Sequence, residues 1–225
     1  MLAYLPLPIE IMKSSFGMIQ VGVKVVPIDP SNVDVIAISI MNNIINSPLM
    51  RASSFIVSHD KESTIHITSE HVCSEIIRFQ KPKKFSKTKT SVMSAALISD
   101  LFSDSHLDEQ INVIPSIFVK DFYGNKHEFG KVLKHDKESD LCKFSTLTVW
   151  GTKSEISDKD CSYGERVYNI ATSGGFYSKN SVPFREGNFS GVYLDKDKPE
   201  NKDVKRNLYT IESLPGSSGS GVYNV

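Results

Sequence analysis

Serine, histidine and aspartate occur in this sequence in settings that suit acyl transfer by a serine hydroxyl. That chemistry needs an activated hydroxyl, a base that takes its proton, a carboxylate that orients the base, and backbone N–H groups directed at the developing oxyanion. Residues 216–221 read Gly-Ser-Ser-Gly-Ser-Gly, between a short β-rich run and another apolar alternation. Small residues let the backbone bend sharply and approach a substrate carbonyl without Cβ clashes. We therefore expect a turn between strands that presents one of these serines.

A base and a carboxylate have candidates upstream of this run. His71 follows the β-rich stretch TIHITS at 64–69, and Asp136 and Asp140 lie where one expected strand ends and the next begins. An imidazole can accept and return a proton near neutral pH, so a histidine suits general base and then general acid catalysis. The order along the chain is histidine, aspartate, serine.

The strings around these residues resemble those of the trypsin-like (chymotrypsin-fold) serine proteases. Thr-Ser-Glu-His-Val-Cys at 68–73 is similar to the family's Thr-Ala-Ala-His-Cys. Residues 136–144 are similar to its string of Asp, a few residues and Asp-Leu-Ala, with Cys142 in place of the alanine. Residues 216–221 are similar to Gly-x-Ser-Gly-Gly-Pro, with Ser and Gly as the last two letters.

Weaker similarity extends the match along the chain. The stretch from Gly164 to Gly175 resembles the strand and glycine turn that open the family's second barrel, and 187–191 resembles its Gly-x-x-Ser-Gly strand. The resemblance covers residues 50–225. Three matching strings in the family's order, each at a strand end, favour membership over a chance cluster of glycine and serine.

The resemblance implies a role for each candidate residue. His71 would take the hydroxyl proton, Asp140 would hold the imidazole, and Ser218 would be the nucleophile. The N–H groups of Gly216 and Ser218 would form the oxyanion hole. The substrate would be a polypeptide, cleaved as by a serine endopeptidase.

Several assignments have competitors. Asp136 could replace the proposed carboxylate, and Ser217 or Ser220 the proposed nucleophile. Glu212 stands before the serine where the trypsin subgroup carries its pocket acid, which would favour substrates with lysine or arginine. A catalytically inactive binding module with the protease fold is the alternative function.

The elements that must position these residues are mostly strands. Runs rich in Val, Ile, Phe, Tyr and Thr alternate with turn residues, which is typical of an antiparallel all-β protein. The expected strands are residues 19–27, 53–58, 64–69, 111–120, 127–135, 141–150, 166–173, 187–195 and 207–213. Tyr123-Gly124-Asn125 predicts a hairpin turn, and 91–110 has the periodicity of one amphipathic helix.

The resemblance implies two antiparallel β-barrels with the active site in the crevice between them. We expect residues 1–50 to be an N-terminal extension packing on the barrels, 51–150 the first β-barrel with an inserted segment at 78–110, and 151–225 the second. The second barrel is expected to be incomplete, because the family continues through further strands beyond the serine. A fragment of a longer product is the favoured explanation.

Composition excludes some partners and cofactors. Lys plus Arg and Asp plus Glu number 26 each, so no global charge steers the protein to nucleic acid or membrane, and the basic run at 81–89 predicts a solvated loop. Residues His66, His71 and Cys73 fit no closed zinc pattern, so neither metal nor cofactor is expected.

The cysteines and the N-terminus bear on the compartment. The 3 cysteines are an odd number at irregular spacing, which argues against a disulfide framework. The N-terminus lacks the basic opening of an export signal, and no apolar run approaches the roughly 18 residues of a membrane helix. A cytoplasmic protein, or a virus-encoded one acting inside a cell, is expected. The oligomeric state is left open.

Overall fold

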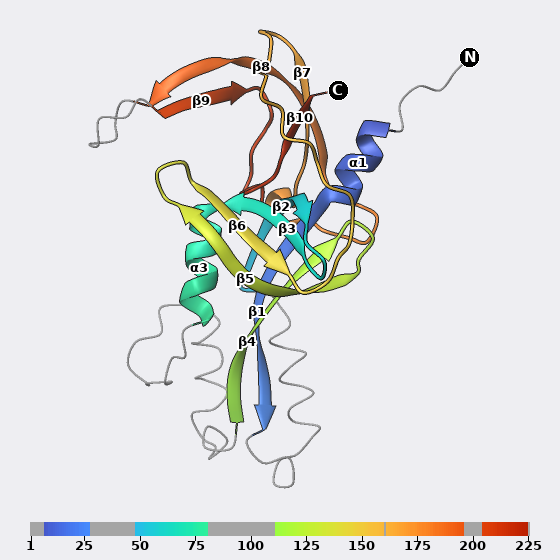
Figure 1. The fold of residues 1–225 in the computed structure, drawn as a ribbon, viewed down its shortest axis with the longest axis vertical. Helices are drawn as coiled ribbons and strands as arrows, with labels where there is room; N and C mark the ends of the chain where they lie inside the picture. Colours follow the sequence, from blue (N-terminus) through green and yellow to red (C-terminus); the bar gives the residue numbers. More distant parts are fainter. Residues whose placement is uncertain (1–6, 28–47, 81–110, 160, 196–203, 225) are drawn as a thin grey trace. The chain divides into compact units, whose positions relative to one another are not determined.

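The computed structural model describes residues 7–27, 48–80, 111–159, 161–195 and 204–224, and these are mostly strands (Figure 1). The predicted helix at 91–110 and the basic run at 81–89 lie outside the described residues. The elements, in chain order, are α1 (Leu7–Ser15), β1 (Phe16–Pro27), β2 (Met50–His59), β3 (Thr64–Ser69), α3 (Glu70–Gln80), β4 (Ile111–Asp121), β5 (Lys126–Asp136), β6 (Leu141–Thr146), β7 (Arg166–Ile170), the 3₁₀ turn η2 (Ser173–Gly175), β8 (Phe184–Asp195), β9 (Val204–Tyr209) and β10 (Val222–Asn224). Within the described residues, no helix has the length and apolar character needed to cross a membrane.

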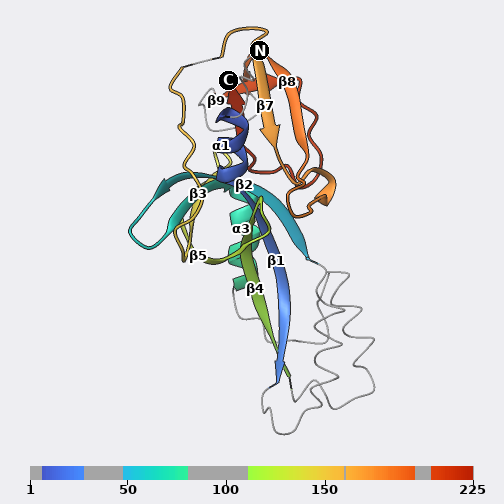
Figure 2. The same ribbon diagram turned by 90° about the vertical axis from the view of Figure 1, so that its right-hand side faces the viewer.

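The strands form one closed barrel and one open sheet. The barrel has the order β1-β2-β3-β6-β5-β4, and the sheet has 4 strands in the order β10-β7-β8-β9. β7 and β8 run side by side in both ribbon views (Figures 1 and 2). The all-β prediction with two barrel-like sheets is confirmed, and the second sheet is a partial barrel. β1 contributes to the closed barrel although it lies inside the stretch that the sequence analysis assigned to an N-terminal extension.

Contacts between residues divide the chain into two units. One unit contains Met1–Ile19, Arg51–Glu75 and Phe118–Val225, and the other contains Gln20–Met50 and Ile76–Ile117. All of the candidate site residues belong to the first unit. A cluster of buried side chains in this unit joins α1 and β1 to later parts of the chain, and it consists of Met12, Phe16, Met18, Phe122, Ile170 and Val182.

Most predicted strands are present, and the differences lie at their ends. β6 ends at Thr146, whereas the sequence predicted strand to residue 150. The reason is local: Thr64 Oγ1 donates to the Thr148 carbonyl at 3.0 Å and accepts from the Trp150 N–H at 2.9 Å, so these backbone groups bond to a side chain instead of the sheet ladder. The predicted hairpin turn is confirmed, since Gly124 has φ +91° between β4 and β5.

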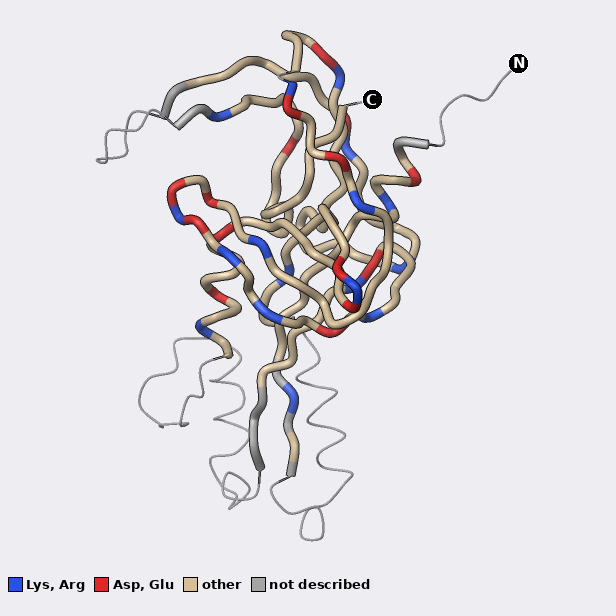
Figure 3. The backbone as a smooth tube through the Cα atoms, viewed as in Figure 1, with Lys and Arg blue, Asp and Glu red and all other residues tan. Residues whose placement is uncertain are grey.

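Charged residues of both signs are spread along the described backbone (Figure 3). The short turn that joins β5 to β6 illustrates this, because Lys137 lies between Asp136 and Glu138. Within the described residues, this turn therefore carries charges of both signs.

One titratable side chain lies entirely inside the barrel. His66 on β3 is 0% exposed, its ring is stacked on Phe144 with centroids 4.9 Å apart, and Trp150 lies 5.0 Å away. Its Nδ1 lies 3.3 Å from Ser54 Oγ. Burial, helped by the nearby His127, lowers the pKa of His66 from 6.5 to about 3. The imidazole is therefore neutral in the folded protein at any pH near neutrality.

This buried histidine should make the fold sensitive to acid. Unfolding lets His66 take up a proton between pH 6.5 and about 3, so the free energy of unfolding falls as the pH falls through this window. A limiting slope of about 1.4 kcal/mol per pH unit gives a loss of about 2 kcal/mol between about pH 7.5 and 5. Urea unfolding at both values should show that His66→Phe removes this part of the loss. An equal pH dependence in the variant would contradict the assignment.

Candidate active site

His71 and Asp140 meet because β3 and β6 are paired in one register. The last residue of β3, Ser69, lies opposite Leu141, the first residue of β6. The segment that follows β3 is therefore next to the segment that precedes β6. His71 Nδ1 lies 3.1 Å from Asp140 Oδ1 and 3.2 Å from Oδ2. Since a carboxylate only accepts, Nδ1 carries the proton in this contact, and in a neutral imidazole the lone pair is then on Nε2.

Asp140 also closes the N-terminal end of α3. Its main-chain carbonyl accepts from the Glu70 N–H at 3.1 Å, and its Oδ1 accepts from the His71 N–H at 3.2 Å. The first N–H groups of a helix have no partner inside the helix, and its positive end favours a carboxylate. Asp140 has φ +52°, a left-handed conformation that aspartate adopts more readily than most residues. This backbone turn directs one side chain to both the helix end and the imidazole.

The pair is open to solvent. The His71 side chain is 58% exposed and the Asp140 side chain 41% exposed. A substrate could therefore reach the imidazole, but an exposed pair of this kind contributes little to holding its own geometry.

The competing carboxylate, Asp136, forms hydrogen bonds within its own turn. Its two oxygens accept from the Glu138 N–H at 2.9 Å and from Ser139 Oγ at 2.9 Å, inside the turn between β5 and β6. The hydrogen bond from the Ser139 hydroxyl is the main reason that the pKa of Asp136 is lowered. Asp136 therefore caps its own turn.

The glycine- and serine-rich run forms two tight turns before β10. The Ser217 N–H donates to Leu214 O at 3.0 Å, and the Ser220 N–H donates to Ser217 O at 3.0 Å. Gly216 has φ +94° and Gly219 has φ +80°, values in the left-handed region that glycine supplies without strain. The expected turn before a strand is confirmed.

The three serine hydroxyls differ in their contacts. Ser217 Oγ lies 2.7 Å from Ser173 Oγ, and Ser220 Oγ accepts from Asn169 Nδ2 at 2.8 Å. Within the described part of the chain, no hydrogen bond uses the Ser218 hydroxyl, and none joins it to His71. The amide N–H groups of Gly216 and Ser218 also have no hydrogen-bond acceptor among the described residues.

Ser53 on β2 anchors this turn, and no sequence pattern predicted this role. The Ser53 N–H donates to Ser218 O at 2.8 Å, and its hydroxyl donates to Gly216 O at 2.9 Å. The same hydroxyl accepts from the Thr172 N–H at 3.0 Å. These bonds hold the carbonyl groups on both sides of the peptide that carries the Ser218 N–H, so they fix the direction of that N–H.

Glu212, the candidate pocket acid, is paired. Its carboxylate accepts a hydrogen bond from the Arg185 guanidinium in an ion pair. The positive partner that the sequence analysis assigned to a substrate is thus supplied by the chain itself.

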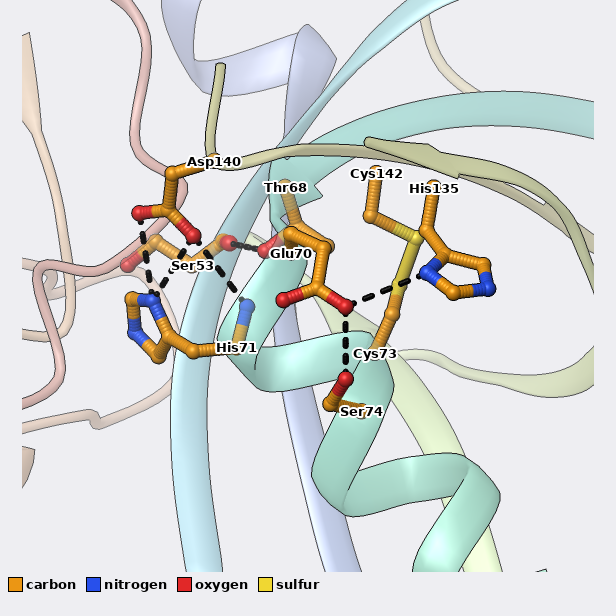
Figure 4. Close-up of a disulfide and its surroundings, with 9 residues drawn as sticks. All are labelled: Ser53, Thr68, Glu70, His71, Cys73, Ser74, His135, Asp140 and Cys142. Atoms are coloured by element: carbon orange, nitrogen blue, oxygen red, sulfur yellow. Dashed lines mark hydrogen bonds and ion pairs between the residues drawn. A yellow bond between two sulfur atoms is a disulfide. The ribbon is translucent and has the colours of Figure 1, made fainter. Parts of the chain in front are cut away.

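The structure corrects one expectation about the cysteines. Cys73 on α3 and Cys142 on β6 form a disulfide with a Cα–Cα distance of 6.3 Å (Figure 4). The odd number and irregular spacing of the cysteines argued against this bond. The two cysteines meet through the β3–β6 register, which cannot be seen from their spacing in the sequence. Cys73 is therefore unavailable as the metal ligand that the sequence analysis considered.

A buried carboxylate lies beside the disulfide. Glu70 is 6% exposed, and its Oε1 accepts from Ser74 Oγ at 2.6 Å and from His135 Nδ1 at 3.1 Å (Figure 4). The hydrogen bond from Ser74 is the largest of the effects that lower the pKa of Glu70. His135 is itself 41% exposed, and no sequence pattern indicated that it contacts Glu70.

Solved structures of proteases resemble this fold. The inactive form of the Rv3671c protease matches with a TM-score of 0.53 at 12% identity, over 95% of this chain and 73% of that chain. The active form of the Rv3671c protease from M. tuberculosis matches with a TM-score of 0.53 at 10% identity, over 95% of this chain and 66% of that one. Deg5 matches with a TM-score of 0.50 at 14% identity, over 95% and 76%. At these identities the likeness concerns the fold alone. No family model and no curated protein matches the sequence.

The anchoring role of Ser53 can be tested against its neighbour. Ser53→Ala leaves the buried Thr172 N–H without an acceptor, and about 1–3 kcal/mol of stability should be lost. Hydrogen exchange at the Ser217 and Ser220 amides should become faster. Ser54→Ala is the matched control, because Ser54 is equally buried on β2 but its hydroxyl donates to Gly17 O at 3.1 Å. Equal exchange in the two variants would argue against the anchor.

Proposed function

Because the chain has the fold of the chymotrypsin-type serine proteases, we propose that it is a serine endopeptidase that hydrolyses peptide bonds through an acyl-enzyme on Ser218. The observation that carries the proposal is the contact of His71 Nδ1 with Asp140 Oδ1 at 3.1 Å. This contact fixes the tautomer in which Nε2 can accept a proton. The polypeptide substrate follows from this reaction class.

The proposed reaction assigns one step to each group. Ser218 Oγ attacks the substrate carbonyl carbon while His71 Nε2 takes the hydroxyl proton, and the carbonyl oxygen becomes an oxyanion. Asp140 stabilises the resulting imidazolium. The imidazolium then gives the proton to the leaving amine, and the peptide C–N bond breaks to leave the acyl-enzyme. Water attacks the ester in the same manner and restores the Ser218 hydroxyl.

Hydrogen bonding favours Ser218 over its neighbours as the nucleophile. The hydroxyls of Ser217 and Ser220 already take part in bonds with Ser173 and Asn169. The N–H groups of Gly216 and Ser218, which have no acceptor among the described residues, suit the oxyanion hole. One such donor is worth roughly 10²- to 10³-fold in rate.

The proposal does not include a trypsin-like preference. The ion pair with Arg185 neutralises the Glu212 carboxylate, so this residue offers little attraction to a substrate lysine or arginine. The substrate side chain that the enzyme prefers is therefore not assigned.

A protease-fold binding module without turnover is the second candidate. It is favoured by one observation: no hydrogen bond joins Ser218 to His71 among the described residues. Catalytic hydrogen bonds are often long before substrate binds, so this geometry is compatible with both candidates. Covalent labelling separates them.

A fluorophosphonate probe should label the protein at Ser218, because the probe requires an activated serine hydroxyl. Mass spectrometry of the labelled peptide locates the site. Ser218→Ala should abolish the label, whereas the matched controls Ser217→Ala and Ser220→Ala should keep it. A wild-type protein that stays unlabelled would support the binding module instead.

The carboxylate assignment has its own test. Asp140→Asn should keep the left-handed backbone, which asparagine tolerates, but it should lower turnover by about 10⁴-fold through the wrong imidazole tautomer. Asp136→Asn is the control, since Asp136 caps only its own turn. The rate of cleavage of an unstructured protein such as casein measures both. A full rate in the Asp140 variant would show that the carboxylate has been misassigned.

A further inference from the structure

The disulfide joins the two segments that carry the proposed base and its carboxylate. Cys73 is two residues beyond His71 on α3, and Cys142 is two residues beyond Asp140 at the start of β6. Figure 4 shows the S–S bond crossing from the first turn of α3 to β6, with Glu70 drawn between this bond and the His71–Asp140 contact. Both cysteines are buried, with exposures of 0% and 1%. The bond therefore links the segment that carries His71 covalently to the segment that carries Asp140.

A second tie acts on the same helical turn. Glu70, directly before His71, binds His135 Nδ1 at 3.1 Å, and His135 lies opposite Cys142 in the β5–β6 ladder. The Glu70 side chain is 8% exposed and the His135 side chain 41%, so only the Glu70 side of this contact is shielded from water. The disulfide and the Glu70 contact thus attach one turn of α3 to two adjacent strands.

Such ties matter because the His71–Asp140 pair is weak by itself. Its two side chains are 58% and 41% exposed, and an exposed ion pair gains little while it restricts two side chains. A general base must nevertheless be held within a fraction of an ångström of its working position, since a displacement of about 1 Å can cost about 10²-fold in rate. The required order has to come from buried contacts around the pair.

From this arrangement we infer that the Cys73–Cys142 disulfide positions His71 on Asp140, so that full peptidase activity requires the oxidised bond. The inference rests on the proposed function and adds its regulation. A dithiol reduces the bond. It donates two electrons and two protons to the two sulfur atoms, which become thiols, and is itself oxidised to a disulfide. The reduced protein is the low-activity form.

The primary test compares kcat and KM of the wild type, of the double variant Cys73→Ala/Cys142→Ala, and of the wild type reduced with dithiothreitol. Both altered forms should lose about 10- to 100-fold in kcat while KM changes by less than about threefold, because the imidazole is misplaced rather than the substrate site. Cys161→Ala is the matched control, and it should respond to dithiothreitol as the wild type does. Dithiothreitol should not change the double variant further. An unchanged kcat in the double variant, or in the fully reduced wild type, would overturn the inference.

Hydrogen exchange tests the positioning role of the disulfide even if the peptidase proposal itself fails. Removal of the bond should speed exchange at the amides of Glu70 and His71, which donate to Asp140, while the β7–β8 ladder in the same unit stays protected. A wild type without turnover or Ser218 labelling would end the peptidase proposal, yet faster exchange at these two amides would still support the positioning role. Unaltered exchange there would overturn it.

A folding defect in the double variant would not obscure the result. Loss of protection in β7–β8 would identify such a defect, and the reduced wild type then decides, because it retains every side chain and leaves no cavity. Reduction that lowers kcat and speeds only the two α3 amides supports the inference, and reduction that does neither contradicts it.

Discussion

The candidate site depends on the antiparallel register of β3 and β6. Ser69 opposite Leu141 places the start of α3 against the residue before β6, and this is why His71 reaches Asp140. A slip of one residue would turn every side chain of a strand to its other face. In that arrangement the fully buried His66 and Phe144 would lose their places inside the barrel. Packing of the barrel interior therefore selects the pairing of two polar residues on its outside.

The β2–β3 ladder connects the histidine to the serine turn. Ser53 binds the carbonyl groups of Gly216 and Ser218, and its own carbonyl accepts from Thr68 Oγ1 at 2.8 Å. Thr68 lies on β3 shortly before the helix that carries His71, the proposed base. A Cβ at Gly219 would overlap both Thr68 Oγ1 and Ser53 O, so the turn is packed directly on the β2–β3 ladder. Three segments that are distant in sequence, namely β2, β3 and the serine turn, thus pack directly on one another.

Sequence patterns predicted local features such as strands and turns, but they did not predict contacts between segments that are distant in sequence. The strand at 64–69 and the turn at Gly216 follow from alternation and glycine content, and the pairing of His71 with Asp140 was expected only through the resemblance of their strings. Ser53, Glu70 and the disulfide were missed or misjudged, since each acquires its role from a strand register that no short string encodes. The part of β1 in the barrel was missed for the same reason, because an apolar run does not reveal its neighbours.

Exposure and order impose opposite demands on a general base. In the proposed role, His71 must face solvent for its Nε2 to meet a substrate, and that exposure weakens its attraction to Asp140 in a high dielectric. The structure meets the second demand with buried groups next in sequence: Glu70 before the histidine, and Cys73 beyond it. When a bound polypeptide excludes water, the Asp140 carboxylate would act through a lower dielectric and stabilise an imidazolium more strongly. In the proposed peptidase, buried ties would then hold the geometry before substrate binds, and electrostatics would gain strength only once substrate covers the site.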